Sequence, residues 1–215
     1  ALMAGMAPFA IEIVDVGLST TPAMFMSTQY KDYATDAAIM ITASHLPFEY
    51  NGLKFFTKTG GAEHEDIEAI LEYAYEIPEA FAEEEQTAVV TEMDLLSTYA
   101  ADLQEKIRKG IASAENPEKP LTGRHIIVDA GNGAGGFFVE RVLQPLGANT
   151  SGSQFLDPDG TFPNHVPNPD NKAAMKSIQD AVIANKADLG IIFDTDVDRS
   201  AIVDSDGKAF NRNNL

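Results

Sequence analysis

Residues 125–146 read HIIVDAGNGAGGFFVERVLQPL, and this stretch decides the fold class. The run His125–Val128 is apolar enough for a buried strand, a glycine-rich turn follows it, and Phe137–Leu146 have helical spacing. A strand that leads through a tight turn into a helix is the repeating unit of α/β proteins. The stretch therefore predicts an α/β fold.

The same alternation of strands and helices extends over the rest of the chain. The periodicity predicts strands at residues 10–16, 38–42, 53–57, 189–193 and 201–203, and helices at residues 63–75, 94–111 and 171–186. We expect Thr21 to cap a further short helix that Pro22 opens, and residues 1–7 to be the end of another helix. Elements of these lengths indicate α/β layers with mostly parallel strand pairing.

Two connections stand out by their composition. Residues 77–92 are rich in glutamate, which predicts a solvent-exposed connection. At Asn116-Pro117-Glu118-Lys119-Pro120 both the composition and the hydrophobic pattern change, which predicts a domain boundary nearby.

The composition is that of a folded protein and excludes several classes of function. Hydrophobic residues make up 44% of the 215 and charged residues 22%, which are ordinary globular values. The formal net charge of −18 argues against a nucleic-acid partner, which requires a basic face. The chain has no cysteine, so disulfides and thiolate metal sites are excluded. No apolar run approaches the ~18 residues of a membrane span, and the first residues lack the basic start of a signal peptide, so we expect no secretion.

The first segment suited to chemistry is residues 41–54, a strand that ends in small and polar residues and resumes after a loop. A serine at the carboxyl end of a strand, here Ser44, can face the sheet edge where open α/β folds bind ligands. Serine is a weak nucleophile by itself, and His45, Lys54 or a metal ion are candidate activators. An ordinary turn with Ser44 as a helix cap explains the same residues.

The second segment is residues 191–199, an apolar strand followed by Asp194, Asp196 and Asp198. Three neighbouring carboxylates repel one another, and a divalent cation would offset that repulsion. Oxygen ligands favour Mg²⁺. Arg199 stands where an EF-hand loop requires glycine, so that motif is a poor explanation; a solvated acidic turn remains the alternative.

The third segment is Asp129–Gly136, in which Gly131, Gly133 and Gly136 satisfy the pattern G-x-G-x-x-G. The pattern is typical of a site for dinucleotide pyrophosphate, with Asp157 at a suitable distance for a ribose contact. Glycines also permit a tight turn and close packing of helix on strand with no ligand.

In this order, the segments resemble the α-D-phosphohexomutase superfamily. Its active-site loop reads T-A-S-H-N-P followed by Y-N-G-x-K, and residues 42–54 match it except for Leu46 in place of Asn. Its metal loop reads D-G-D-A-D-R, and residues 194–199 match it with Thr195 and Val197 in place of Gly and Ala.

The second domain of that superfamily supplies two further matches. It opens with a V-D-x-G-N-G-A-G-like turn, similar to residues 128–135, and has a D-G-x-F-P-N-H segment, similar to residues 159–165. The resemblance implies two consecutive three-layer α/β/α domains with mixed, mostly parallel sheets, at residues 1–96 and 97–215. It also implies a phosphohexomutase, an isomerase that moves a phosphoryl group reversibly between positions 1 and 6 of a hexose or hexosamine phosphate, through hexose 1,6-bisphosphate.

The resemblance implies roles for individual residues as well. Ser44 would be the phosphorylated residue. Arg199 would donate hydrogen bonds to the phosphoryl oxygens, and His45 would assist by hydrogen bonding. Lys54 would be the general acid or base, with a pKa lowered by the metal and the arginine. Mg²⁺ would be held by Ser44, Asp194, Asp196 and Asp198.

Departures from the superfamily leave alternatives open. Its N-terminal arginine-bearing segment, third-domain sugar loop and fourth-domain phosphate-binding loop have no counterpart here. We therefore expect either the amino-terminal part of an active mutase, incomplete for activity by itself, or a shortened relative that is a non-catalytic subunit of a larger protein assembly. The sequences of residues 15–22 and of Ser44–Pro47 resemble a plant and algal branch labelled phosphoglucosamine-mutase-like. We therefore expect the protein to be located in the cytoplasm or the plastid stroma.

Two other enzyme classes compete with this interpretation. In a haloacid-dehalogenase-like phosphatase Asp194 would be the nucleophile, but Asp198 stands where that family has Thr or Val, and Ser44 would be unexplained. A dinucleotide enzyme, which would rest on the glycine pattern alone, is the least favoured.

Overall fold

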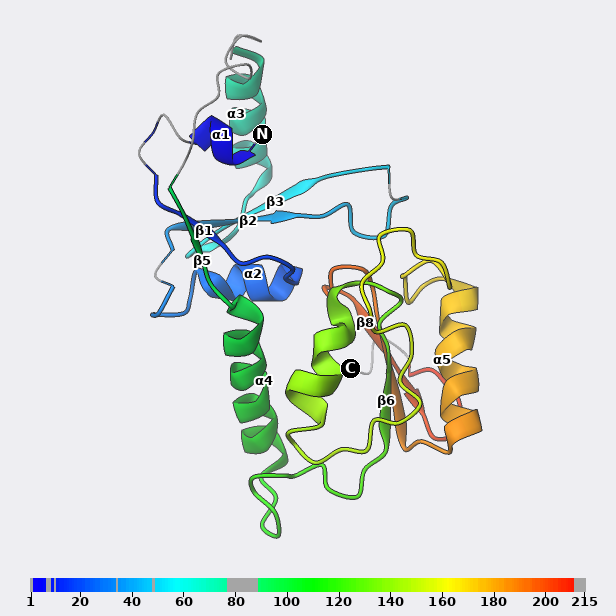
Figure 1. The fold of residues 1–215 in the computed structure, drawn as a ribbon. Helices are drawn as coiled ribbons and strands as arrows, with labels where there is room; N and C mark the ends of the chain where they lie inside the picture. The colour runs from blue at the N-terminus through cyan, green and yellow to red at the C-terminus, as the bar shows by residue number, and fades with distance from the viewer. Residues whose placement is uncertain are drawn as a thin grey trace.

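The structure is a computed structural model that describes residues 2–6, 9, 11–33, 35–47, 49–76 and 89–210. Figure 1 shows two layered halves with one long helix, α4, between them. Within the described ranges, no helix has the length and apolar character needed to cross a membrane. Most of the acidic connection predicted at residues 77–92 lies outside these ranges.

The first half has two small sheets. β1 and β5 pair in parallel, whereas β2, β3 and β4 form an antiparallel sheet. α2 covers this second sheet, and Phe25 of α2 meets Phe56 of β3 edge-on with 6.0 Å between the ring centroids. None of the residues of α3 is buried. The elements are, in order, α1 (Leu2–Met6), β1 (Ile13–Asp15), α2 (Thr21–Ser27), β2 (Ala37–Ile41), β3 (Leu53–Thr57), β4 (Gly60–Gly61), α3 (His64–Glu76) and β5 (Val90–Glu92).

The start of α2 differs from the prediction by one residue. Thr20, not Thr21, is the N-cap: its backbone is extended, and its Oγ1 accepts a hydrogen bond from Ala23 N at 3.2 Å. Thr21 is the first helical residue. Because Thr20 satisfies the end of the helix, the hydroxyl of Thr21 is free to contact the second half of the molecule.

The long helix α4 (Leu95–Ile111) shares a core with each half. Leu95 packs in a buried cluster with Ala23 of α2. One turn further on, Ala100 packs with Val142 of the second half. The helix therefore joins the two halves by packing as well as by connection.

The second half is a mixed sheet with helices on both faces, as expected. Its strand order is β6-β7-β8, with β6 parallel and β8 antiparallel to the central β7. Ile127 of β6 packs toward α5, and the next residue, Val128, packs toward η4 on the other face, as strand alternation requires. The elements are β6 (Ile126–Asp129), the 3₁₀ helix η3 (Ala134–Gly136), the π-helix η4 (Val139–Leu143), α5 (Lys172–Asn185), β7 (Leu189–Phe193) and β8 (Ser200–Asp204).

The middle of the helix predicted at residues 137–146 is a π-helix, Val139–Leu143. Gln144 N donates to Val139 O at 3.0 Å, a bond five residues back along the chain. Pro145 has no N–H to give to Arg141 O, and that carbonyl accepts instead from Gln104 Nε2 of α4 at 2.8 Å. The proline thus frees a carbonyl that anchors the long helix.

Candidate active site

The loop that carries Ser44 is a closed connection between β2 and β3. Thr42 N donates to Gly52 O at 2.9 Å, and a Cβ on Gly52 would lie only 2.8 Å from Thr42 O. Ser44 itself has a φ of +54°, a conformation that costs a residue other than glycine about 1–3 kcal/mol and that is concentrated at functional sites. Its N–H donates to Thr42 Oγ1 at 2.9 Å. Ser44 starts no helix, so the alternative of a helix cap is wrong.

His45 is the nearest candidate activator of Ser44. The exposed His45 ring has its Nδ1 3.4 Å from Ser44 Oγ, at the outer limit of a hydrogen bond. Its assisting role stays a prediction.

The three aspartates predicted as metal ligands lie together at the end of β7. One carboxylate oxygen from each of Asp194, Asp196 and Asp198 lies within 4.8 Å of the other two. The first two side chains are 0% and 2% exposed, and that of Asp198 is 33% exposed. Burial raises the pKa of Asp194 to about 6; a hydrogen bond from the N–H of Arg199 opposes the rise, and repulsion from the other two carboxylates adds to it.

Arg199 holds Asp194. Its N–H donates to Asp194 Oδ1 at 3.0 Å, its Nε donates to Asp194 Oδ2 at 3.0 Å, and its Nη1 donates to Asn168 Oδ1 at 3.3 Å. The expected contact with a phosphoryl group on Ser44 stays a prediction. Because both oxygens of the fully buried Asp194 accept bonds from Arg199, the geometry gives no support to Asp194 as the nucleophile of a phosphatase.

Lys54 connects the Ser44 hairpin to the aspartates. Its Nζ donates to Asp196 Oδ2 at 2.8 Å and to Asp198 Oδ2 at 2.7 Å. Burial acts to lower the pKa of Lys54, but the hydrogen bonds and charges of the two carboxylates outweigh it and raise that pKa above its ordinary value. The expectation of a lowered pKa, which assumed a bound metal and an arginine as neighbours, stays a prediction.

Asp196 receives two further donors from the first half. Thr21 Oγ1 donates to Asp196 Oδ2 at 2.6 Å, and Thr21 N donates to Asp196 O at 2.9 Å; Thr42 also hydrogen bonds to this carboxylate. Burial acts to raise the pKa of Asp196, but the bonds from Lys54, Thr21 and Thr42 hold it below its usual range. Thr21 was predicted as a helix cap and not as a site residue, although the pair Thr20-Thr21 before Pro22 offers two hydroxyls where one suffices for the cap.

The residues present fit a divalent cation. Asp196 Oδ1 is buried and has no hydrogen-bond partner within the described part of the chain. A buried carboxylate oxygen without a partner is costly, and a hard cation such as Mg²⁺ is a partner of suitable chemistry. Asp194 and Asp198 lie beside Asp196, and the three residues together offer a set of three anionic oxygen ligands.

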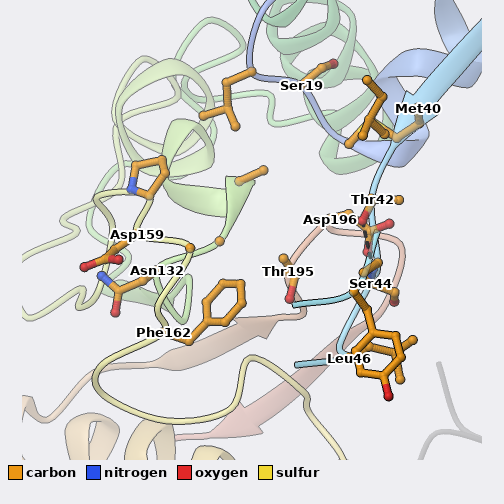
Figure 2. A pocket seen from close by; sticks show the side chains of 18 of the residues that line it. Ser19, Met40, Thr42, Ser44, Leu46, Asn132, Asp159, Phe162, Thr195 and Asp196 are labelled. Carbon is orange, nitrogen blue, oxygen red and sulfur yellow. Dashed lines mark hydrogen bonds between the residues drawn. The ribbon is translucent and has the colours of Figure 1, made fainter. Parts of the chain in front are cut away.

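A cleft of about 270 Å³ between the two halves brings the predicted segments together. Figure 2 shows Ser44 and Asp196 on one side of this cleft, Asn132 and Phe162 on the other, and Thr195 between them. The loop with the serine and the loop with the aspartates therefore share one cavity, as the sequence analysis required.

The glycine-rich turn does not offer a phosphate site. The N–H groups of residues 130–134 all donate within the protein, that of Gly131 to Asp129 Oδ1 and that of Ala134 to Thr195 O. A Cβ on Gly133 would lie 2.6 Å from Thr195 O, and one on Gly136 would lie 2.1 Å from Leu156 O. The glycines serve close packing, Gly133 against the aspartate loop and Gly136 against Leu156, and the turn gives no support to a dinucleotide site.

The segment 159–165 ends in a buried ion pair that the sequence analysis did not identify. His165 Nε2 lies 3.0 Å from both carboxylate oxygens of Asp129, and His165 Nδ1 lies 3.0 Å from Val166 O. The His165 side chain is 5% exposed. Burial acts to lower the pKa of His165, but the Asp129 carboxylate and the Val166 carbonyl outweigh it and raise that pKa. The pair fastens one wall of the cleft to β6.

Two family models match the chain. The model described as "Phosphoglucomutase/phosphomannomutase, alpha/beta/alpha domain I" matches residues 1–80, and the one described as "alpha/beta/alpha domain II" of the same family matches residues 97–207.

Individual relatives agree with these matches. The chain is 32% identical to a phosphoglucomutase of Neisseria meningitidis over 94% of this chain and 41% of the relative. It is 33% identical to a phosphoglucosamine mutase of Limosilactobacillus reuteri over 96% of this chain and 43% of the relative. The crystal structure of a phosphoglucomutase/phosphomannomutase family protein from Burkholderia thailandensis superposes with a TM-score of 0.74 at 26% identity, covering 97% of this chain and 42% of that one. The chain thus spans about two fifths of the length of these relatives, and it belongs to the phosphoglucomutase/phosphomannomutase family of the α-D-phosphohexomutase superfamily.

Proposed function

We propose that the protein is a phosphohexomutase that moves a phosphoryl group between positions 1 and 6 of a hexose or hexosamine phosphate, through a phosphoserine at Ser44 and a hexose 1,6-bisphosphate. One observation carries the proposal. Lys54, on the strand that follows the Ser44 loop, contacts Asp196 and Asp198 at 2.8 and 2.7 Å. The names of the relatives support the reaction class.

Charge is the first requirement of this chemistry. A phosphoserine carries about −1.5 to −2 charges, which three aspartates would repel. Bound Mg²⁺ would offset this repulsion and polarise the phosphorus. Asp194, Asp196 and Asp198 would hold the ion together with an oxygen of Ser44, and Arg199 fixes Asp194 through its two carboxylate oxygens.

Proton transfer is the second requirement. When the phosphoryl group passes to a sugar hydroxyl, the bond from Ser44 Oγ to phosphorus breaks and a bond from the sugar oxygen to phosphorus forms. One proton leaves the sugar hydroxyl, and one is gained by Ser44 Oγ. We assign this proton exchange to Lys54, whose ammonium is held beside the aspartates, with His45 as a hydrogen-bonding partner.

The remainder of the proposal concerns the whole protein. Because the relatives are more than twice as long as the matched region, we assign the choice of sugar to segments like those the relatives have outside it. This chain by itself would then carry the phosphoserine and the metal but would be incomplete for turnover. We place the protein in the cytoplasm or the plastid stroma, which a fluorescent fusion of the full reading frame tests.

The first half-reaction tests the proposal on the chain itself. Incubation with glucose 1,6-bisphosphate and Mg²⁺ should place one phosphate on Ser44, detected by mass spectrometry of the peptide. Ser44→Ala should remove this phosphate, whereas Ser205→Ala, at an exposed turn after β8, should keep it. Phosphate on another residue, or unchanged mutase activity of Ser44→Ala in the full-length protein, contradicts the proposal.

A further inference from the structure

The two carboxylate oxygens of Asp196 lie in opposite environments. Oδ2 accepts hydrogen bonds from Thr21 Oγ1 at 2.6 Å and from Lys54 Nζ at 2.8 Å. Oδ1 is equally buried but has no hydrogen-bond partner within the described residues. The bonds from Thr21 and Lys54 therefore gather on one oxygen and leave the other for a ligand.

Thr21 is the most rigid of these donors. Its backbone N–H binds the backbone carbonyl of Asp196 at 2.9 Å while its hydroxyl binds the carboxylate of the same residue. Thr21 is 8% exposed and sits at the first position of α2, where Thr20 caps the helix and Ala23 is fully buried. Two bonds to one residue from a fixed backbone determine both the position and the rotation of the Asp196 side chain.

Lys54 is a weaker determinant of this rotation. Its side chain is 32% exposed, and its Nζ is shared between Asp196 and Asp198. A long lysine side chain can follow a carboxylate that moves, whereas a threonine hydroxyl on the first turn of a helix cannot.

We infer that Thr21 is a positioning residue: it turns Asp196 so that Oδ1 faces the cation, and so couples the first half of the protein to the metal centre. This inference rests on the proposed metal site and adds a residue to it. Partners of metal ligands typically change metal affinity 10–100-fold when they are removed. The expected effect on binding is therefore measurable without any turnover.

The test is metal binding by the 215-residue chain. Mn²⁺ is titrated into the chain and its free form is followed by electron paramagnetic resonance, with Mg²⁺ as competitor. Thr21→Val keeps the shape and the backbone N–H but removes the hydroxyl, and should weaken Mn²⁺ binding about 10-fold or more. Thr21→Ser restores a hydroxyl and should bind within about twofold of the unchanged chain.

Thr28→Val is the matched control for loss of stability. Thr28 caps the other end of α2, is 3% exposed, and gives its hydroxyl to Phe25 O at 2.8 Å. It should lower the melting temperature but leave Mn²⁺ affinity unchanged. If Thr21→Val does not fold, Thr21→Ala removes the same hydroxyl with less bulk and is held to the same expectation.

The outcomes separate this inference from the function on which it rests. If the unchanged chain binds Mn²⁺ saturably and Thr21→Val binds it with equal affinity, the role of Thr21 is overturned but the metal centre is not. The same holds if Thr21→Ser loses as much affinity as Thr21→Val. No saturable Mn²⁺ binding by the unchanged chain overturns the metal centre itself and the positioning role with it.

Discussion

At the scale of single residues, the surroundings of His165 fix its charge. Both ring nitrogens face acceptors, namely the Asp129 carboxylate and Val166 O, at 3.0 Å. Such a ring is held best when both nitrogens carry a proton. The two acceptors therefore favour the protonated ring, and the pKa of His165 is raised.

A pH dependence of stability follows. Because the pKa of His165 is higher in the folded than in the unfolded state, its stabilisation is fully present below the unfolded pKa of about 6.5 and is lost as pH rises through the folded pKa. Urea denaturation should show a falling free energy of unfolding as pH rises above about 6.5. His165→Asn should lose this part of the slope and about 1–3 kcal/mol of stability at pH 6, whereas His64→Asn, at a side chain that is 85% exposed, should keep the slope. Equal slopes for His165→Asn and the unchanged chain would rule the pair out as its origin.

The glycines of the turn after β6 provide a second prediction at this scale. Gly136→Ala would place a Cβ 2.1 Å from Leu156 O, which is backbone and cannot move cheaply, and should destabilise the chain by at least about 1–3 kcal/mol. Gly160→Ala, whose Cβ would meet nothing within 4 Å, should change stability by less than about 0.5 kcal/mol. Thermal unfolding of the two variants measures the difference, and equal losses would contradict the packing role.

Residue types in a motif were predictable, and their partners were not. Ser44 and the three aspartates could be chosen because each follows an apolar strand with a chemically distinctive pattern. Thr21 and the ion pair of His165 with Asp129 could not be chosen, since threonine and histidine are common and only the tertiary fold supplies their partners. The two carboxylates that contact Lys54 could not be chosen for the same reason.

At the scale of elements, the residue that caps the C-terminal end of α4 has a left-handed backbone conformation that alanine does not favour. Its C-cap, Ala112, has a φ of +47°, and the left-handed conformation costs a residue with a Cβ about 1–2 kcal/mol. Ala112→Gly should therefore stabilise the chain by about 1 kcal/mol. Ala101→Gly, at an exposed position inside the same helix, should destabilise it by about 0.5–1 kcal/mol. The same sign of change in melting temperature for both variants would contradict this account.

Elements with strong internal periodicity were predicted well. The helix predicted at residues 171–186 appears as Lys172–Asn185, and the strand predicted at 189–193 appears unchanged. β5 was not predicted and lies inside the predicted acidic connection. Its residues are exposed and carry no apolar pattern of their own, and the strand forms by pairing with β1. The π-helix lies just before Pro145 and accepts a hydrogen bond from Gln104 of α4, and periodicity reports no such contact.

At the scale of the whole molecule, we expect the aspartate cluster to make stability depend on divalent cations. The chain has a net charge of −18, and three of its carboxylates lie within 4.8 Å of one another. A ligand present at 100 times its dissociation constant stabilises the folded state by about 2.7 kcal/mol. Saturating Mg²⁺ should therefore raise the melting temperature more than NaCl of equal ionic strength does.

Asp198→Asn tests this origin of the stabilisation. It removes one ligand charge from the most exposed of the three aspartates and should abolish most of the difference between MgCl₂ and NaCl. Asp206→Asn, on the exposed turn after β8, removes the same charge elsewhere and should preserve the difference. If Mg²⁺ still raises the melting temperature more than NaCl does in Asp198→Asn, the stabilisation comes from general screening of the negative charge and not from this site.

The layered α/β architecture was predictable from the alternation of elements, but the way the halves join was not. α4 contributes Leu95 to one core and Ala100 to another, so a boundary drawn from composition near Asn116–Pro120 misses the packing that spans the helix. The division at residues 96 and 97 stays a prediction.

The bond between Thr21 and Asp196 also determines when the cleft can form during folding. Its partners are 175 positions apart in the chain, and contacts between such distant residues form late because closing so long a loop costs entropy first. During synthesis the amino-terminal half emerges first, so the Thr21 hydroxyl and the Lys54 ammonium stay hydrated until β7 and the aspartate loop after it leave the ribosome. The cleft between the halves is then completed only after both halves have acquired their own cores.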